Sequence, residues 1–337
     1  MRRIVANRLL GALVQVLVVT LLAWLLFYVI ARFTGASPAQ RIAGKNATPA
    51  QVALVSRLLG LNKPYWEQYL IFLNHLIHGN FGFSYVQMRP VSAILWPATR
   101  ATASLVLGAA VIWLLIAAPV GAYGGLRPRS VGDVVGRAVA ILGMSIPVFW
   151  LAPMISYFLG YQPTQGDLFG LPILPVGTSI FPINGYVDFS QNPAQWAYHL
   201  LLPWITLAIG FAAIYIRFIR TLTAEQLSED YARTAKAKGA STLRVLVQHV
   251  GRNVAPTVSV LLGADIATAL TGVFFVETVF GIPGLGYTGL SAIENLDYPV
   301  ITGVIIVAAL IAVLANTIVD LLHAVLDPRL RRVAATH

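Results

Sequence analysis

The chain has 337 residues, of which 57% are hydrophobic and only 11% are charged, and its formal net charge is +10. Soluble globular domains carry about 25% charged residues. The composition therefore argues against an ordinary soluble enzyme, and the mean hydropathy of +0.74 predicts several membrane spans. Because the chain contains no cysteine, it has neither a disulfide framework nor a thiolate metal site.

Six apolar stretches are long enough to cross a bilayer, which requires about 20 residues. The first follows Arg2, Arg3 and Arg8 as in a signal peptide, but its apolar run is longer than the roughly 7–15 residues of a signal-peptide core, so we expect a retained anchor. We predict an all-α membrane protein with six transmembrane helices. The predicted spans are Leu9–Ala31, Ala103–Gly125, Ala138–Gly160, Ala197–Ile219, Val254–Val276 and Ile301–His323.

The basic residues predict the orientation of these spans. Outside the segment 32–102, every Lys and Arg lies before the first span, after the last, between spans two and three, or at the end of span four and in the loop that follows it. The loops 161–196 and 277–300 contain none. Since short cytoplasmic loops carry the basic excess, both termini are predicted to be cytoplasmic. This alternation also argues against one nucleic-acid-binding patch.

The long outer segment 32–102 is predicted to contain two helices. Thr48-Pro49 begins one that ends at Gly60, and Pro64 begins another that ends at Gly79. The second presents Trp66, Leu70, Leu73 and Ile77 on one face. That face suits a membrane surface, the mouth of a pathway, or packing on the bundle, and the sequence leaves these open. His75 and His78 lack a third ligand, so they do not indicate a metal site.

The inner loop 222–253 is the longest polar stretch between spans on the predicted cytoplasmic side. Thr223 and Gln226 have the spacing of a capping box, and Glu229 and Arg233 that of a favourable i,i+4 ion pair. Gly239 is predicted to end this helix. Ser241 is predicted to cap a second one with an apolar face formed by Leu243, Leu246 and Val247. A partner protein and anionic lipid both fit such a basic loop.

Acidic residues inside spans are costly, so they are candidates for a translocation pathway. Asp265 lies deep in predicted span five, and Glu277 lies at its outer end. For Asp265 a buried pair with another helix remains an equal alternative. The prolines Pro119, Pro147, Pro153 and Pro203 interrupt spans two to four and predict kinks.

The run Glu229–Gly239, followed by His249 and Arg252-Asn253, resembles the coupling loop of ABC importer permeases of the dipeptide, oligopeptide and nickel family. Further matching pieces cover nearly the whole chain. They are Leu59–Pro64, Gly79–Ser84, Val276–Phe280, Pro283–Gly286, Asp297–Val300 and Asp327–Arg329. Pro256 departs from the family spacing by one position, which affects the expected entry into span five.

The resemblance implies the type I ABC importer permease fold and a loop that docks on a cytoplasmic ATPase. Arg233-Thr234-Ala235 stand where the general motif has Glu-Ala-Ala, and Gly239 is the motif's glycine. The residues expected to couple to the ATPase are Asp230, Tyr231, Arg233, Thr234, Ala235, Lys236, Lys238, Gly239 and Ala240. The implied partners are a second homologous permease, two ATPase subunits, an extracytoplasmic substrate-binding protein and the lipid bilayer.

The chain is expected to bind no cofactor itself, because no P-loop motif occurs. The resemblance implies that ATP and Mg²⁺ bind to the ATPase subunits. Gly284–Gly289 fits G-x-G-x-x-G, but it follows a span rather than a strand, so we expect a turn there. The chain divides into 1–31, 32–102, a permease core 103–326 and a tail 327–337.

Together with the apolar spans, the family resemblance implies a non-enzymatic, multi-pass permease of the bacterial cytoplasmic membrane that carries short peptides. Import of nickel or another small solute is the alternative. An ion-coupled secondary transporter is a weaker one, because only Asp265 is deeply placed. An intramembrane enzyme lacks a matching constellation of residues.

Overall fold

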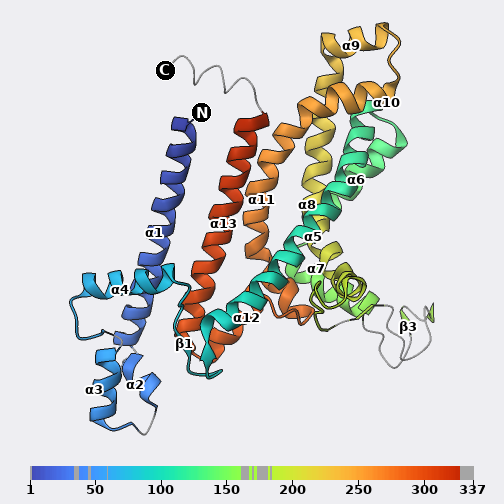
Figure 1. The fold of residues 1–337 in the computed structure, drawn as a ribbon. Helices are drawn as coiled ribbons and strands as arrows, with labels where there is room; N and C mark the ends of the chain where they lie inside the picture. Colours follow the sequence, from blue (N-terminus) through green and yellow to red (C-terminus); the bar gives the residue numbers. More distant parts are fainter. Residues whose placement is uncertain are drawn as a thin grey trace. The chain divides into compact units, whose positions relative to one another are not determined.

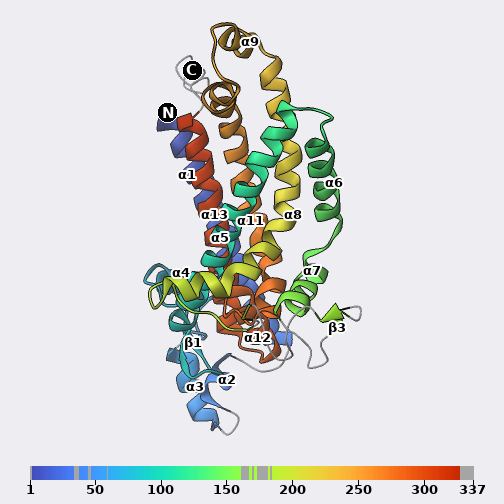
Figure 2. The ribbon, with the colours of Figure 1, turned by 90° about the vertical axis from the view of Figure 1, so that its right-hand side faces the viewer.

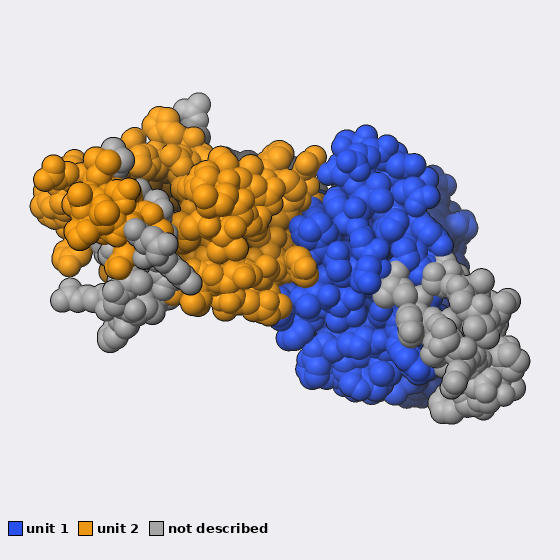
Figure 3. Space-filling model, turned by 90° about the horizontal axis from the view of Figure 1, so that it is seen from below, with its two compact units in different colours: residues 1–8, 101–283, 314–337 blue, residues 9–100, 284–313 orange. Residues whose placement is uncertain are grey.

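The computed structural model describes residues 2–33, 38–44, 47–58, 60–160, 167–168, 171–172, 181–182 and 184–326. The motif Asp327–Arg329 and the predicted tail lie outside these residues. Figure 1 shows a chain built almost entirely of helices, which confirms the predicted all-α class. The chain divides into two compact units (Figure 3): 1–8, 101–283 and 314–337 form unit 1, and 9–100 and 284–313 form unit 2.

The elements follow one another with short connections. They are α1 Arg2–Phe33, α2 Pro38–Ala43, α3 Pro49–Leu58, α4 Tyr65–Ile77, β1 Phe83–Ser84, β2 Arg89–Pro90, α5 Val91–Leu126, α6 Val131–Ser145, α7 Val148–Ile155, the π-helix η1 Ser156–Gly160, β3 Asp167–Leu168, β4 Leu171–Pro172, α8 Pro193–Ser228, α9 Asp230–Ala237, α10 Thr242–Arg244, the π-helix η2 Val245–Val250, α11 Gly251–Val279, α12 Leu285–Glu294 and α13 Tyr298–Leu326. The strands form two antiparallel two-residue ladders, β1 with β2 and β3 with β4.

Within the described residues, four helices are long and apolar enough to cross a membrane. They are Val91–Leu126, Pro193–Ser228, Thr242–Leu270 and Tyr298–Ile318. The pair α6 and α7 makes a fifth if it is counted as one broken span, and the described apolar part of α1, Leu9–Leu25, is shorter. The apolar helices are therefore confirmed, whereas six spans remain a prediction.

The third predicted span is not one continuous helix. Its two halves, α6 and α7, are bent by 102°. The break lies at Ile146-Pro147, where Ile146 is extended with φ −96° and ψ 115°. Proline clashes with a helical residue before it, so Pro147 ends α6 outright. By contrast, Pro119 and Pro203 lie inside the unbroken helices α5 and α8.

Small residues bring α5 and α8 together in unit 1. A Cβ atom on Gly108 would lie 2.1 Å from the Trp204 ring, and one on Gly125 would lie 2.7 Å from Cβ of Thr223. Trp204 also donates from Nε1 to the carbonyl oxygen of Ser104 at 2.9 Å. Such close approach of small residues is how membrane helices gain packing energy. On another side of α8 lies α6, as Figure 2 shows.

Unit 2 joins segments that are far apart in the sequence. Val91 and Leu95 at the start of α5 are buried with Leu285 of α12 and Val300 of α13. Ser84 donates a hydrogen bond to Asp297, and both side chains are buried. Two of the quoted motif pieces, Gly79–Ser84 and Asp297–Val300, thus meet in this unit.

Three local predictions in unit 2 can be checked. Thr48 caps α3, since its Oγ1 accepts from the Gln51 backbone N–H at 3.3 Å. α3 and α4 end just before Gly60 and Gly79, whose φ angles are 67° and 72°, so these helix ends are confirmed. The predicted turn at Gly284–Gly289 is wrong, because Leu285 already begins α12. Gly289 there packs on α13, where an added Cβ would lie 3.2 Å from Val304.

Candidate functional site

The inner loop begins later than predicted. Thr223 does not cap a helix but lies inside α8, and only 2% of it is exposed. Thr223 packs closely on Gly125 of α5, and α8 continues as far as Ser228. Glu229 is extended and precedes α9, so the predicted pair with Arg233 is absent from the ion pairs of the described residues; Arg233 instead lies 3.8 Å from Asp230.

Gly239 ends α9 with a Schellman motif. Its N–H donates to the Lys236 carbonyl oxygen at 2.9 Å, and the Ala240 N–H donates to the Ala235 carbonyl oxygen at 3.1 Å. The φ of Gly239 is 83°, and nothing lies within 4 Å of the position of an added Cβ. Glycine is therefore required by the backbone conformation, not by crowding.

The second helix of the loop is continuous with the next long helix. Ser241 caps α10 as predicted, accepting from the Arg244 N–H at 3.3 Å. The chain then passes through the π-helix η2 directly into α11. The predicted apolar face is wrong: Val245 and Val250 are buried, whereas Leu243 is 69% and Val247 63% exposed. The reason is the i→i+5 spacing of a π-helix, which places residues five apart on one side.

The short helix α9 packs on the buried valines of η2 and the start of α11. Ala232 and Ala235 of α9 form an apolar cluster with Val245, Val250 and Val254. The opposite side of α9 is open: Asp230, Arg233, Thr234, Lys236, Lys238 and Gly239 are exposed, Tyr231 and Ala240 are half-buried, and only Ala235 is buried. The structure therefore brings all nine predicted coupling residues into one helix and its C-terminal turn.

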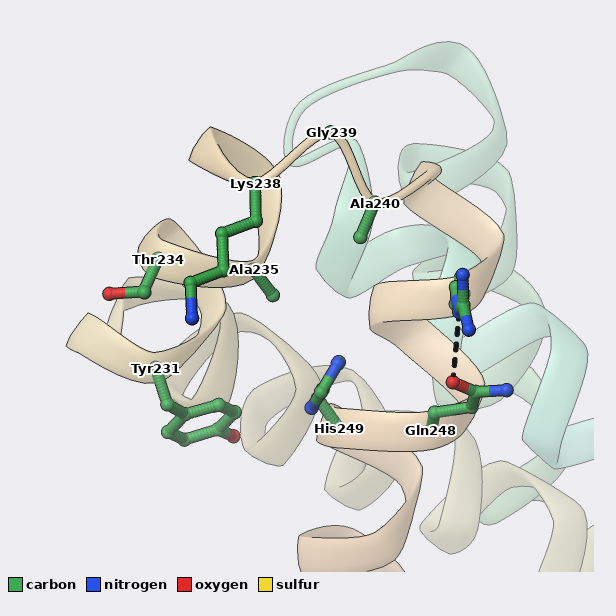
Figure 4. A pocket seen from close by; sticks show the side chains of 9 residues that line it. Tyr231, Thr234, Ala235, Lys238, Gly239, Ala240, Gln248 and His249 are labelled. Atoms are coloured by element: carbon green, nitrogen blue, oxygen red, sulfur yellow. Dashed lines mark hydrogen bonds between the residues drawn. The ribbon is translucent and has the colours of Figure 1, made fainter.

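A hollow of about 690 Å³ lies between α9 and η2, as Figure 4 shows. Tyr231 and Lys238 come from the side of α9, and His249 faces them from η2. Arg244 also lines the hollow and donates from Nε to Gln248 Oε1 at 3.1 Å. With Lys238, Arg244 and His249 at its wall, the hollow suits an acidic or polar protein segment more than an apolar one.

Asp265 of α11 is half-buried in unit 1 and lies beside Tyr215 of α8. It interacts with the Tyr215 hydroxyl group, yet neither Tyr215 Oη nor Asp265 Oδ2 has a hydrogen-bond partner among the described residues. The Tyr215 ring lies 6.1 Å from that of Trp113, which stacks on Phe211 at 4.6 Å. The sequence indicated Asp265, because a charged residue stands out within an apolar span. It did not indicate Tyr215, because a tyrosine is not unusual in such a span.

Glu277 lies far from Asp265 and has a different environment. It is fully buried and accepts a hydrogen bond of 2.5 Å from Thr102 Oγ1 of α5. It lies twelve positions after Asp265 in the same helix, or about 18 Å along α11. The structure thus does not bring the two predicted pathway carboxylates into one site.

Residues 117–332 match the family described as binding-protein-dependent transport system inner membrane component. Residues 1–106 match the N-terminal region described for the same kind of protein. The chain belongs to this family. As an inner membrane component, the permease is not itself an enzyme, and its family description implies a substrate-binding protein and an ATPase as partners.

Similar proteins cover nearly the whole permease. A probable peptide ABC transporter permease of Sinorhizobium fredii is 34% identical over 95% of this chain and 97% of its own length. Dipeptide transport system permeases of Alkalihalophilus pseudofirmus and Escherichia coli K12 are 35% and 32% identical, over 88% and 87% of this chain and 90% and 89% of their own lengths.

One polar cluster of the permease was not found from the sequence. Asp133, buried near the start of α6, accepts hydrogen bonds from Arg220 Nε and, at 2.9 Å, from Arg220 Nη2 of α8. The backbone N–H of Arg129 donates to the same carboxylate at 2.9 Å, with Arg129 held at φ 64°. An added Cβ on Gly124 of α5 would lie 3.0 Å from Asp133 Oδ1. Ser130, three residues before Asp133, was the available signal, because it caps α6.

Proposed function

We propose that the chain is the membrane-spanning permease subunit of an ABC importer for short peptides. The observation that supports the substrate is that similar proteins covering nearly its whole length are named as peptide or dipeptide permeases. The complex contains a second homologous permease subunit, two ATPase subunits and an extracytoplasmic substrate-binding protein. The fold is of type I with six spans, and both termini and α9 are cytoplasmic.

In this proposal, 103–326 is the permease core and 32–102 is the extracytoplasmic segment. The short helix α9 inserts into the ATPase and transmits its closure. The exposed side of α9 and the basic hollow beside it support this role. A helix that docks on a partner needs an accessible face and a firm attachment to the rest of its own chain. Asp265 and Tyr215 line the route of the substrate, where an unpaired carboxylate oxygen is available to a peptide amine.

A glycine comparison tests the coupling role. Gly239→Val forces a β-branched residue into a left-handed conformation, which distorts the turn after α9. Gly79→Val is the matched control, because Gly79 also ends a helix, has φ 72° and has nothing within 4 Å of an added Cβ. The measurement is ATP hydrolysis by the assembled complex in the presence of binding protein and dipeptide, per folded complex.

We expect Gly239→Val to lose most of the stimulation and Gly79→Val to retain it. Equal stimulation in the two variants would contradict the role of α9. Uptake of a labelled dipeptide and of Ni²⁺ by proteoliposomes containing the whole complex tests the substrate separately. Saturable Ni²⁺ uptake without dipeptide uptake would show that the substrate is a metal ion and not a peptide.

A further inference from the structure

The helix α4 presents an apolar stripe that no described residue covers. Trp66 is 66%, Leu70 54% and Ile77 81% exposed. These residues are four and seven positions apart, so they share one face of the helix. Charge does not interrupt the stripe, since the one ionised side chain of α4, Glu67, is paired with Lys63 at 2.6 Å.

The flank of α4 next to the stripe is fixed to α1. Tyr69 donates from its hydroxyl group to the Leu17 carbonyl oxygen at 3.2 Å, and the same hydroxyl lies 3.1 Å from Thr20 Oγ1. The Tyr69 ring meets Trp24 edge to face with centroids 5.7 Å apart. Figure 1 shows α4 crossing α1 at this level. The contacts of Tyr69 thus hold the stripe in place on the surface of α1.

The part of α1 beneath α4 has the surface of a helix in lipid. Leu13, Val14, Leu21 and Leu22 of the apolar run Leu9–Leu25 are 55%, 51%, 40% and 58% exposed. Because the permease is an inner membrane component, exposed leucines at this density face acyl chains. Tyr69 attaches α4 to this part of α1, at Leu17 and Thr20.

Aromatic side chains mark the level of the junction. Tyr69 of α4 meets Trp24 of α1, Tyr65 and Trp66 lie in the first turn of the same helix, and Trp and Tyr concentrate where acyl chains meet headgroups. A helix with one apolar face and an aromatic rim lies in the plane of that interface. We propose that α4 is an interfacial helix whose Trp66, Leu70 and Ile77 side chains insert among lipid acyl chains.

This assignment selects one of the positions that the sequence left open for α4. It depends on the membrane location of the family and not on the peptide substrate or on coupling through α9. It also sets the level of one membrane boundary at Trp24, closer to the start of α1 than the predicted end of the first span at Ala31.

Because the chain contains no cysteine, each substitution gives it a single labelling site. Spin labels are attached to Trp66→Cys, Leu70→Cys and Ile77→Cys, one at a time, in the whole complex reconstituted into bacterial-lipid nanodiscs. His75→Cys is the matched control, because His75 is exposed on the opposite side of the same helix. The measurement compares collisions of each label with oxygen, which concentrates in acyl chains, and with a water-soluble nickel chelate.

We expect oxygen collisions to exceed chelate collisions at positions 66, 70 and 77 and the ratio to reverse at position 75. Equal ratios at all four positions would overturn the proposal. Labels that are open to the chelate until binding protein is added, and then protected, would also overturn it in favour of a protein-docking surface. If one variant fails to assemble, the remaining two positions still decide between these outcomes.

Discussion

Two carboxylates in unit 1 lie against the same helix, α8, and have opposite environments. Asp133 is tied to α8 by two hydrogen bonds from Arg220, and it accepts a third from the Arg129 backbone. Arg137 lies 3.6 Å away. Asp265 lies against α8 from α11, and its Oδ2 is buried without a hydrogen-bond partner among the described residues.

The difference separates a structural carboxylate from an available one. Native structures satisfy nearly all buried polar groups, so an unsatisfied one calls for an explanation such as a ligand or a catalytic role. Asp133 is buried and already accepts three hydrogen bonds, and its partners come from α6, α8 and the turn between α5 and α6. Asp265 retains that capacity, which is why it is the better candidate for contact with a transported solute.

Breaking the Asp133 cluster should have the largest effect. Asp133→Ala leaves Arg220 without its carboxylate, and removing one partner of a buried ion pair destabilises a protein by about 3–5 kcal/mol. The lower end applies, since 24% of the Arg220 side chain is exposed. Thermal unfolding of the detergent-solubilised complex measures this.

The double variant Asp133→Ala with Arg220→Met is its control. Replacing both partners removes the isolated charge, so most of the lost stability should return. If the double variant is as unstable as the single one, the cluster contributes through packing and not through its charges.

The Glu277 environment provides an intermediate case. Thr102→Val removes the hydroxyl group that donates to Glu277 Oε1, and a lost hydrogen bond to a buried charged group costs about 1–3 kcal/mol. Thr206→Val is the matched control, because Thr206 is also buried but donates only to the Leu202 carbonyl of its own helix at 2.8 Å. Melting temperatures that fall equally in both variants would show that the Glu277 contact adds nothing.

Asp265→Asn should have the smallest effect on stability, within about 1 kcal/mol, because no hydrogen bond to Oδ2 is lost and a buried charge is removed. Dipeptide uptake per folded complex should nevertheless change, with Tyr215→Phe altering it in the same assay. If Asp265→Asn lowers stability as much as Asp133→Ala and leaves uptake unchanged, Asp265 serves to hold helices together. It would then not differ in role from Asp133.

Two identical sequence patterns show the limit of local prediction. Thr48 and Gln51, like Thr223 and Gln226, are three residues apart as in a capping box. The first pair forms it, with the Thr48 N–H donating to Gln51 Oε1 at 2.8 Å. The second pair lies inside α8, because Thr223 is buried against Gly125 of α5. The capping box therefore formed at Thr48, whose side chain is not packed against another long helix, and did not form at Thr223, whose side chain is.

The sequence by itself determined the helical class, the apolar lengths of the long helices, the helix ends at Gly60, Gly79 and Gly239, and the family. Each of these depends on residues within a few positions of one another or on composition, and glycine ends a helix wherever a left-handed residue is needed. Tertiary structure decided the break of 102° after α6 and the buried side of η2. It also decided the pairing of Asp133 with Arg220 and of Ser84 with Asp297, and it placed Tyr215 beside Asp265. These partners are tens to hundreds of residues apart, and only the close packing of helices at small residues such as Gly108, Gly124 and Gly125 sets which polar groups meet.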